Sequence, residues 1–283
     1  MLIDVGQYLF RVDSVPSIVK NNLKLMYGDA VSNISLAPAD YTISLKHDSL
    51  LRKFLKPQVT FYLGSNSPFK PLPASQSYPV MEWGMNWCIA ATDFNRLIVH
   101  AAVLVKNNKA IVFPATPGSG KSTLSACFAL NGWKLYSDEM AIIDLESLKV
   151  MPLFRPICLK NESISLIKKW FPESILTEIA KDTQKGDVAH LKVNSFSEYK
   201  KLLPTDIIAI VFPQYQEKTK TKPYKINKIS GFEKLAANSF NYNILGSTAF
   251  NTIQRIVERT QQVEINYSDL SDVDELLTSE FTL

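Results

Sequence analysis

The chain has 283 residues, of which 46% are hydrophobic and 20% are charged, and its formal net charge is +4. The lysines are scattered and no apolar run approaches the ~18 residues of a membrane span, so we expect neither a nucleic-acid nor a membrane partner. We also expect no signal peptide and, from three cysteines in apolar or mixed settings, reduced thiols. Together these features predict a cytoplasmic globular protein.

Short alternating or apolar runs, broken by turn residues, fill the first 80 residues. Gln7–Val12, Tyr41–Leu45 and Gln58–Leu63 predict strands, and Ile18–Met26 predicts a helix. Prolines and serines between residues 65 and 73 mark the end of this region. We therefore predict a small α/β module over residues 1–80 and a larger domain over residues 81–283.

A β-hairpin is predicted at the start of the larger domain. Two strand-like runs, Arg96–Lys106 and Lys109–Phe113, are joined by Asn107-Asn108, and asparagine tolerates the positive φ that a tight hairpin turn needs. The chain is thus expected to enter the next loop from an antiparallel hairpin rather than from a βαβ unit.

A glycine-bearing loop follows the hairpin and opens a helical segment that ends at Asn131-Gly132. Strand, glycine loop, Lys-Ser and helix together are the sequence form of a phosphate-binding loop, although an ordinary strand–helix turn is the alternative. Backbone N–H groups and the helix dipole would favour an anion, Lys121 could reach the terminal phosphates, and Ser122 could ligate Mg²⁺. The predicted nucleotide contacts are Thr116, Pro117, Gly118, Ser119, Gly120, Lys121, Ser122 and Thr123.

Two adjacent acids, Asp138 and Glu139, follow a predicted strand at Trp133–Ser137. Neighbouring side chains on a regular strand face opposite ways, so two acids that serve one site require a strand end or a bulge. Proteins with a phosphate-binding loop usually have a second motif, an apolar strand that ends in Asp. The predicted strand Asp206–Phe212, which Pro213 stops, does not end in an acid. We expect Asp138 and Glu139 to take its place; a solvated turn is the alternative.

The remaining patterns predict mostly helices, with Asn161 as the N-cap of the first. The predicted helices are Asn161–Trp170, Pro172–Asp182, Ser230–Phe240, Gly246–Arg259 and Asp269–Ser279, and Gln262–Tyr267 is a predicted strand.

Several segments in this order form a more specific set than the loop alone: Glu82–Trp87, His100–Ala102, Pro117–Thr123, Gly132–Glu139, Arg155–Lys160, Lys185–His190 and Phe240–Gly246. The set resembles the HPr kinase/phosphorylase catalytic domain, whose nucleotide core is similar to that of phosphoenolpyruvate carboxykinase, and most closely the branch called HprK-related kinase A. The resemblance runs from about residue 7 to residue 277. It implies an α/β fold with a mixed-sheet P-loop core, binding of ATP and Mg²⁺, and, as an expectation, a homo-oligomer.

The resemblance also implies residue roles. Asp138 corresponds to the general base toward the acceptor hydroxyl, and Glu139 to the acid that holds the metal together with Ser122. His100 falls near the active site, and Arg155 falls in the region that contacts phosphate or acceptor. Lys121 is the remaining catalytic candidate, because phosphoryl transfer needs its positive charge.

The leading hypothesis is therefore an ATP- and Mg²⁺-dependent kinase that acts on a hydroxyl of a peptide, protein or small molecule. A nucleotide-gated binding module with little or no phosphotransfer is the alternative from another class. A carboxykinase-like transfer to a carboxylate or enolate is a weaker third.

Overall fold

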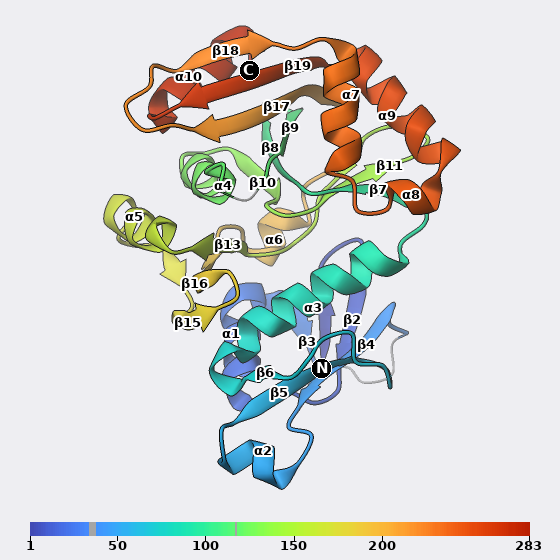
Figure 1. Ribbon diagram of the computed structural model, residues 1–283, viewed down its shortest axis with the longest axis vertical. Helices are drawn as coiled ribbons and strands as arrows, with labels where there is room; N and C mark the ends of the chain where they lie inside the picture. Colours follow the sequence, from blue (N-terminus) through green and yellow to red (C-terminus); the bar gives the residue numbers. More distant parts are fainter. Residues whose placement is uncertain (34–37, 117) are drawn as a thin grey trace. The chain divides into compact units, whose positions relative to one another are not determined.

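The computed structural model describes residues 1–33, 38–116 and 118–283, and it is a mixed α/β structure (Figure 1). The chain forms two compact units. The first contains Met1–Ile89 and Phe154–Lys201, and the second contains Ala90–Leu153 and Leu202–Leu283. This division differs from the predicted boundary at residue 80, because residues 154–201 pack within the first unit and the boundary falls inside helix α3.

The first unit contains a six-stranded sheet with the order β3-β1-β2-β4-β5-β6. Its strands are β1 (Leu2–Asp4), β2 (Leu9–Val12), β3 (Val31–Ser32), β4 (Tyr41–Lys46), β5 (Gln58–Leu63) and β6 (Leu72–Pro73). Its helices are α1 (Ser17–Tyr27), α2 (Leu50–Phe54) and α3 (Ser77–Thr92), with short 3₁₀ turns at Gly28–Ala30 and Ala74–Gln76. The strands and the helix predicted for residues 7–63 are therefore confirmed.

A smaller antiparallel sheet completes the first unit. Its elements are β13 (Ile157–Lys160), β14 (Ile175–Leu176), β15 (Ala180–Thr183) and β16 (Gly186–Lys192), accompanied by α5 (Glu162–Trp170) and α6 (Phe196–Tyr199).

One prediction fails in this part of the chain, and a second holds only for the backbone. The helix predicted at Pro172–Asp182 is wrong, because β14 and β15 both pair with β16 and tertiary pairing overrides local preference. The buried Thr177 strengthens this pairing, since its hydroxyl accepts a hydrogen bond from the backbone N–H of His190 at 2.9 Å. Helix α5 forms as predicted with Asn161 at its N-cap position, but the Asn161 side chain makes no capping hydrogen bond and instead accepts from the backbone N–H of Asp187.

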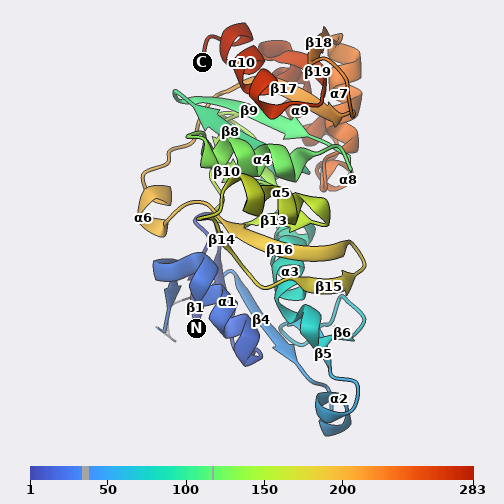
Figure 2. The ribbon, with the colours of Figure 1, turned by 90° about the vertical axis from the view of Figure 1, so that its left-hand side faces the viewer.

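The second unit is built on a six-stranded mixed sheet with the order β10-β8-β9-β17-β19-β18 (Figure 2). Its strands are β8 (Ala101–Lys106), β9 (Lys109–Pro114), β10 (Lys134–Ser137), β17 (Ile207–Tyr215), β18 (Lys222–Lys225) and β19 (Gln261–Tyr267). A three-stranded sheet is formed by β7 (Arg96–Val99), β11 (Ala141–Asp144) and β12 (Val150–Met151). Its helices are α4 (Lys121–Leu130), α7 (Lys228–Ala237), α8 (Tyr242–Leu245), α9 (Ser247–Arg259) and α10 (Leu270–Glu280).

The hairpin β8–β9 has the turn that its sequence predicts. Asn107 and Asn108 adopt φ values of 48° and 58°, as a type I′ turn requires. The single strand predicted for residues 96–106 is instead two strands, because β7 pairs with β11 in one sheet and β8 pairs with β9 in the other. His100 lies at the break between them.

Helices α7 and α9 lie side by side and cover one face of the six-stranded sheet (Figure 1). Helix α9 buries the stripe Ala249, Ile253, Ile256 and Val257, whose spacing is that of one helical face. Alternate residues of β8 enter this core, so the residues between them face the opposite side, where α4 packs against the strand. The sheet is therefore covered on both faces near β8 and β9.

Pro213 does not stop its strand as predicted, because β17 continues to Tyr215. Strand β9 pairs with β17 only between Ile207 and Ile210, whereas β19 pairs along the rest of the strand, including Pro213. At Pro213 the strand has β19 as its one paired neighbour, so the missing N–H is tolerated on the other side.

The outer strand β18 reads Lys-Pro-Tyr-Lys, and all four of its residues are exposed. It pairs with β19 on one side, while its opposite side forms one of the two edges of the sheet.

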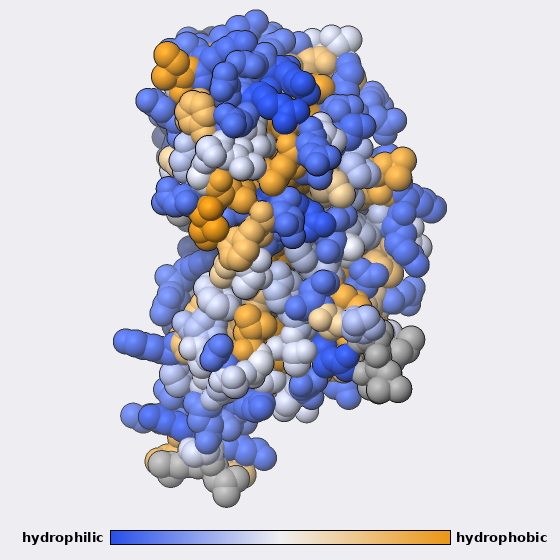
Figure 3. All heavy atoms as spheres, turned by 90° about the vertical axis from the view of Figure 1, so that its right-hand side faces the viewer, coloured by the Kyte–Doolittle hydropathy of each residue, from blue (hydrophilic) through white to orange (hydrophobic). Residues whose placement is uncertain are grey.

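Among the described residues, no helix is both long enough and apolar enough to cross a membrane. On the face drawn in Figure 3, apolar side chains form separate patches among hydrophilic ones.

None of the three cysteines, all of which the structure describes, forms a disulfide. Cys88 and Cys158 are buried, and Cys127 is half-buried. Burial raises the pKa of the Cys88 thiol to about 12, so this group stays protonated and unreactive at neutral pH.

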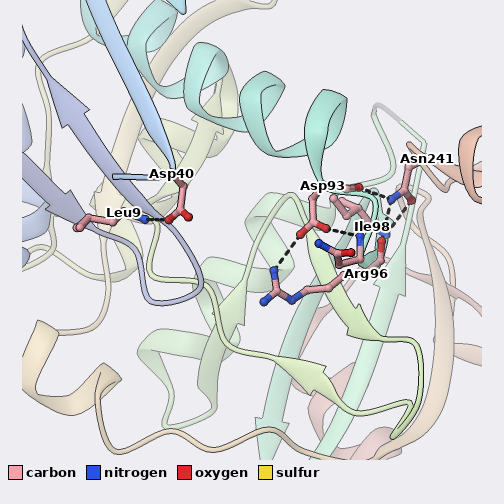
Figure 4. A network of polar contacts seen from close by, with 7 residues as sticks. Leu9, Asp40, Asp93, Arg96, Ile98 and Asn241 are labelled. Carbon is pink, nitrogen blue, oxygen red and sulfur yellow. Dashed lines mark hydrogen bonds and ion pairs between the residues drawn. The ribbon is translucent and has the colours of Figure 1, made fainter. Parts of the chain in front are cut away.

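Asn241 joins the segment before α8 to strand β7 (Figure 4). Its side chain is completely buried, accepts a hydrogen bond from the Ile98 N–H at 3.0 Å, and donates to the carbonyls of Asp93 and Arg96. Asp93 also forms an ion pair with Arg96 at 2.9 Å. All the polar groups of this amide are therefore used to hold backbone in place.

We predict that Asn241→Ala destabilises the second unit by about 1–3 kcal/mol, since it leaves a buried N–H without its acceptor. Native-state hydrogen exchange of the amides of β7 measures this change. Asn243→Ala is the matched control, because Asn243 is exposed and should shift stability by less than about 0.5 kcal/mol. Equal effects of the two substitutions would contradict the role given to Asn241.

Candidate functional site

Five chain segments of the second unit meet at one edge of its six-stranded sheet. Strands β9, β17 and β19 are parallel, and β10 runs in the same direction because both β9 and β10 are antiparallel to β8. The carboxyl ends of four strands and the start of β8, next to His100, therefore lie together. Ligands of open α/β sheets bind at the carboxyl ends of strands, which makes this edge the candidate site.

The glycine loop, by which we mean Ala115, Thr116 and Gly118–Gly120, joins β9 to α4. Gly118 and Gly120 have φ values of +87° and +86°, which side-chain-bearing residues rarely adopt. A Cβ atom at Gly120 would also lie 2.4 Å from the Tyr267 hydroxyl, whereas one at Gly118 would meet open space. Gly120 is thus required by both conformation and packing.

Two neighbouring strands anchor this loop through the carbonyl of Ser119. That carbonyl accepts hydrogen bonds from the Tyr215 N–H at 3.1 Å and from the Tyr267 hydroxyl at 3.4 Å. Both tyrosines stand at strand ends, because β17 and β19 extend beyond the end of β9. Sequence reasoning missed the role of both: Tyr267 ends the predicted strand Gln262–Tyr267, whereas Tyr215 lies beyond the predicted end of its strand.

The start of α4 offers unpaired polar groups. Its N-cap is Gly120 and no side chain caps its first turn, so the N–H groups there have no side-chain acceptor. The hydroxyl of Ser119, a residue only 2% exposed, has no hydrogen-bond partner. Thr116 is exposed and Thr123 is half-buried, while Pro117 lies outside the described residues.

Lys121 and Ser122 both contact Asp138. The ammonium group of Lys121 donates to the main-chain carbonyl of Asp138 and lies 3.8 Å from its Oδ1, and the Ser122 hydroxyl donates to its Oδ2 at 3.1 Å. The side chains of Lys121 and Asp138 are only 8% and 2% exposed. Asp138 Oδ1 has no hydrogen-bond partner, so one acceptor oxygen beside the lysine remains unused.

The two acids lie at a strand end, as the sequence predicts. The register of β10 shifts between Leu135 and Ser137, and the chain then leaves for β11 in the other sheet. The Ser137 hydroxyl accepts from the N–H of Met140 and closes this turn. The side chain of Asp138 meets Lys121 and Ser122, while the carbonyl of Glu139 meets His100.

His100 is held beside both acids. Its Nδ1 lies 3.1 Å from the Glu139 carbonyl, and because a carbonyl only accepts, Nδ1 carries the proton and Nε2 of the neutral ring is an acceptor. Burial, and then the positive charge of Lys121, lower the pKa of His100, although the charge and carbonyl of Glu139 and the charge of Asp138 oppose this shift. The ring is therefore neutral at neutral pH.

Arg155 belongs to the first unit, where it pairs with Glu82 of α3 at 2.5 Å. The Tyr27 hydroxyl donates to the same carboxylate, and the side chains of Arg155 and Glu82 are 6% and 4% exposed. Burial acts to lower the pKa of Arg155, but Tyr27 and Glu82 raise it overall. A contact of Arg155 with phosphate or acceptor stays a prediction; Nη1 of its buried guanidinium has no hydrogen-bond partner.

No protein-family model and no curated protein matches this chain. Among the described residues there is also no group of three or more His, Cys, Asp or Glu side chains that could hold a metal ion. The resemblance to HPr kinases therefore stays a prediction, and the site has to be judged from its own geometry.

We predict that Gly120→Ala destabilises the second unit more than Gly118→Ala. The positive φ costs each variant about 1–2 kcal/mol, and the contact with Tyr267 adds roughly 1–3 kcal/mol for Gly120→Ala alone. Tyr267→Phe removes the clashing oxygen, so the cost of Gly120→Ala should fall in that background. Native-state hydrogen exchange of α4 measures wild type, the three single variants and the Gly120→Ala/Tyr267→Phe double variant. Strictly additive effects of Gly120→Ala and Tyr267→Phe would argue against the contact.

The lowered pKa of His100 predicts a pH-dependent stability. Above the unfolded value of about 6.5 both states hold a neutral ring, but below it the unfolded chain binds the proton more readily. Wild type should therefore lose stability as pH falls through 6.5 toward the lower folded pKa, and His100→Gln should lose less. Urea unfolding between pH 5 and 8 tests this; parallel curves for the two proteins would refute it.

Proposed function

We propose that this protein is an ATP- and Mg²⁺-dependent kinase that transfers the γ-phosphoryl group to a hydroxyl of a peptide, protein or small molecule. The observation that carries the proposal is the meeting of Lys121, Ser122 and Asp138 at the uncapped start of α4. Phosphoryl transfer depends mainly on positioning and on charge neutralisation, and these groups can supply both. The resemblance to HPr kinases points to the same reaction.

The residues of the loop fit a polyphosphate. The first N–H groups of α4 lack side-chain acceptors, the Ser119 hydroxyl is buried without a partner, and the position of Gly118 is open. A helix N-terminus with such free donors favours an anion through both hydrogen bonds and the helix dipole. Lys121, at the first helical position, adds a full positive charge.

The oxygen atoms beside Lys121 fit Mg²⁺. Ser122 and Glu139 would hold the ion. The Ser122 hydroxyl lies 3.1 Å from the carboxylate of Asp138, the residue before Glu139, so the metal and the proposed base would be neighbours. Hard oxygen ligands of this kind, together with phosphate oxygens, are what Mg²⁺ takes in nucleotide sites. When bound, Mg²⁺ supplies neutralisation of the charge on the phosphate oxygens.

The protein's own groups then have distinct tasks in the transfer. The acceptor oxygen bonds to the γ-phosphorus as the bond from that phosphorus to the oxygen of ADP breaks, and the hydroxyl proton passes to the Asp138 carboxylate. Lys121 stabilises the charge that develops on the departing ADP oxygen. His100, neutral and held by the Glu139 carbonyl, adds no charge beside Asp138.

One observation favours the alternative, a nucleotide-gated binding module. Asp138 is only 2% exposed and is already engaged by Lys121 and Ser122, whereas a general base must reach the proton of its acceptor. The kinase therefore requires that nucleotide binding draws Lys121 toward phosphate and frees Asp138. In the binding module, Asp138 would keep these contacts with Lys121 and Ser122 and would accept no proton.

Turnover by variants of Asp138 and Lys121 distinguishes the two functions. Asp138→Asn should lower ADP release from Mg-ATP by about 10²–10⁴-fold, since it removes the base, while the Kd for ATP changes little. Lys121→Ala should weaken ATP binding itself. The measurement is made with and without lysate of the source cells as acceptor.

Lys134→Ala is the matched control, because Lys134 is exposed on β10, and it should behave as wild type. Turnover that Asp138→Asn does not change, with ATP still bound, would reject the kinase and favour the binding module. Absence of ATP binding by wild type would reject both.

A further inference from the structure

The chain just before α8 is fastened along His100 and β7. The N–H of His100 donates to the carbonyl of Asn238 at 2.7 Å, and the N–H of Phe240 donates to the carbonyl of Ile98 at 2.8 Å. Val99 and Ser239 form an antiparallel bridge between these bonds. The sequence motif Phe240–Gly246 thus begins directly beside a residue of the candidate site.

Phe240 is held at the surface rather than left there by a loose loop. Its own N–H is bonded to β7, and the next residue is Asn241, whose buried amide makes three hydrogen bonds to backbone (Figure 4). Nevertheless its side chain is 48% exposed, and the ring stands edge-on to His100 with the centroids 5.5 Å apart. An aromatic ring kept half-exposed on a rigid segment is a ready contact for a ligand.

Phe240 lies beside His100, away from the tyrosines that hold the glycine loop. His100 lies on the β8 side of β9, close enough to Lys121 and Asp138 for their charges to influence it, and Asp138 follows β10 on the same side. Tyr215 and Tyr267 hold the glycine loop from the other side. In the proposed reaction the acceptor hydroxyl has to reach Asp138, and an acceptor that came from the β8 side would meet His100 and the Phe240 ring packed on it.

More apolar side chains follow Phe240 along the chain. Ile244 of α8 is 57% exposed, and Phe250 of α9 is 47% exposed, with its ring packed on Phe232. A polypeptide can contact several such side chains at once, whereas a small hydroxyl compound cannot.

We propose that Phe240 is a specificity-determining residue that selects a peptide acceptor with an apolar side chain next to its serine hydroxyl. This inference rests on the proposed kinase function and narrows its substrate class. The phenyl ring of Phe240 contacts the apolar side chain, and His100 separates that contact from Asp138. The serine hydroxyl then reaches the carboxylate while its neighbour is buried against the ring.

A degenerate peptide library with one fixed serine, labelled by Mg-ATP carrying a radioactive γ-phosphate, tests the proposal. Wild type should enrich Phe, Leu, Ile or Met at one position flanking the serine. Phe240→Ala should abolish that enrichment and lower labelling about tenfold, as expected for the loss of an apolar contact. Phe240→Leu should retain the preference, because it keeps an apolar surface.

Two controls separate specificity from folding and from nucleotide binding. Phe94→Ala removes another phenyl ring, 50% exposed in the same unit, and should leave the labelling pattern unchanged. The Kd for ADP should stay within about twofold of wild type in every variant, as expected when only acceptor binding is altered.

The outcomes that overturn the inference are distinct from those that overturn the kinase. Labelled peptides without an apolar preference, or the same preference in Phe240→Ala, refute the role of Phe240 and leave the kinase in place. Absence of labelled peptides while ADP still binds refutes the peptide acceptor and leaves the nucleotide site in place. Absence of ADP binding refutes the proposed function and the inference with it.

Discussion

The pairing of Lys121 with Asp138 is the constraint on which the candidate site depends. Both side chains are almost fully buried. Removing one partner of a buried ion pair lowers the stability of a folded protein by about 3–5 kcal/mol. Each charge is therefore tolerated because of the other. Lys121 begins α4, which follows β9, and Asp138 follows β10. The pair therefore joins the ends of two strands that β8 separates in the sheet.

The first unit also contains a buried ion pair, formed by different residues. Arg155 is buried against Glu82, and Tyr27 donates to the same carboxylate, so the charge is neutralised and hydrogen-bonded within the unit. Removing either partner of such a pair leaves the other charge buried without compensation, which is strongly destabilising. In this chain such pairs lie at α3 in one unit and at α4 in the other.

The sequence was most informative where local chemistry decides the backbone. The Asn-Asn turn of the hairpin, the glycines of the loop, the start of α4 and the acids at a strand end all depend on residues adjacent in the chain. The predictions are wrong where the backbone depends on partners distant in the chain. Pro213 lies inside β17 because β19 pairs with it, and β14 and β15 form strands because both pair with β16. Tyr215, Tyr267 and Asn241 carry no local signal for their roles, since each acts on backbone far away in the sequence.

The open edge at β18 has a consequence for how copies of this chain can associate. Unpaired strand edges invite another strand to continue the sheet, and charged residues and proline on an edge oppose this. Here an incoming strand would meet Lys222 and Lys225 and would find no N–H donor at Pro223. A homo-oligomer of this protein is therefore not expected to form through a sheet continued across the β18 edge.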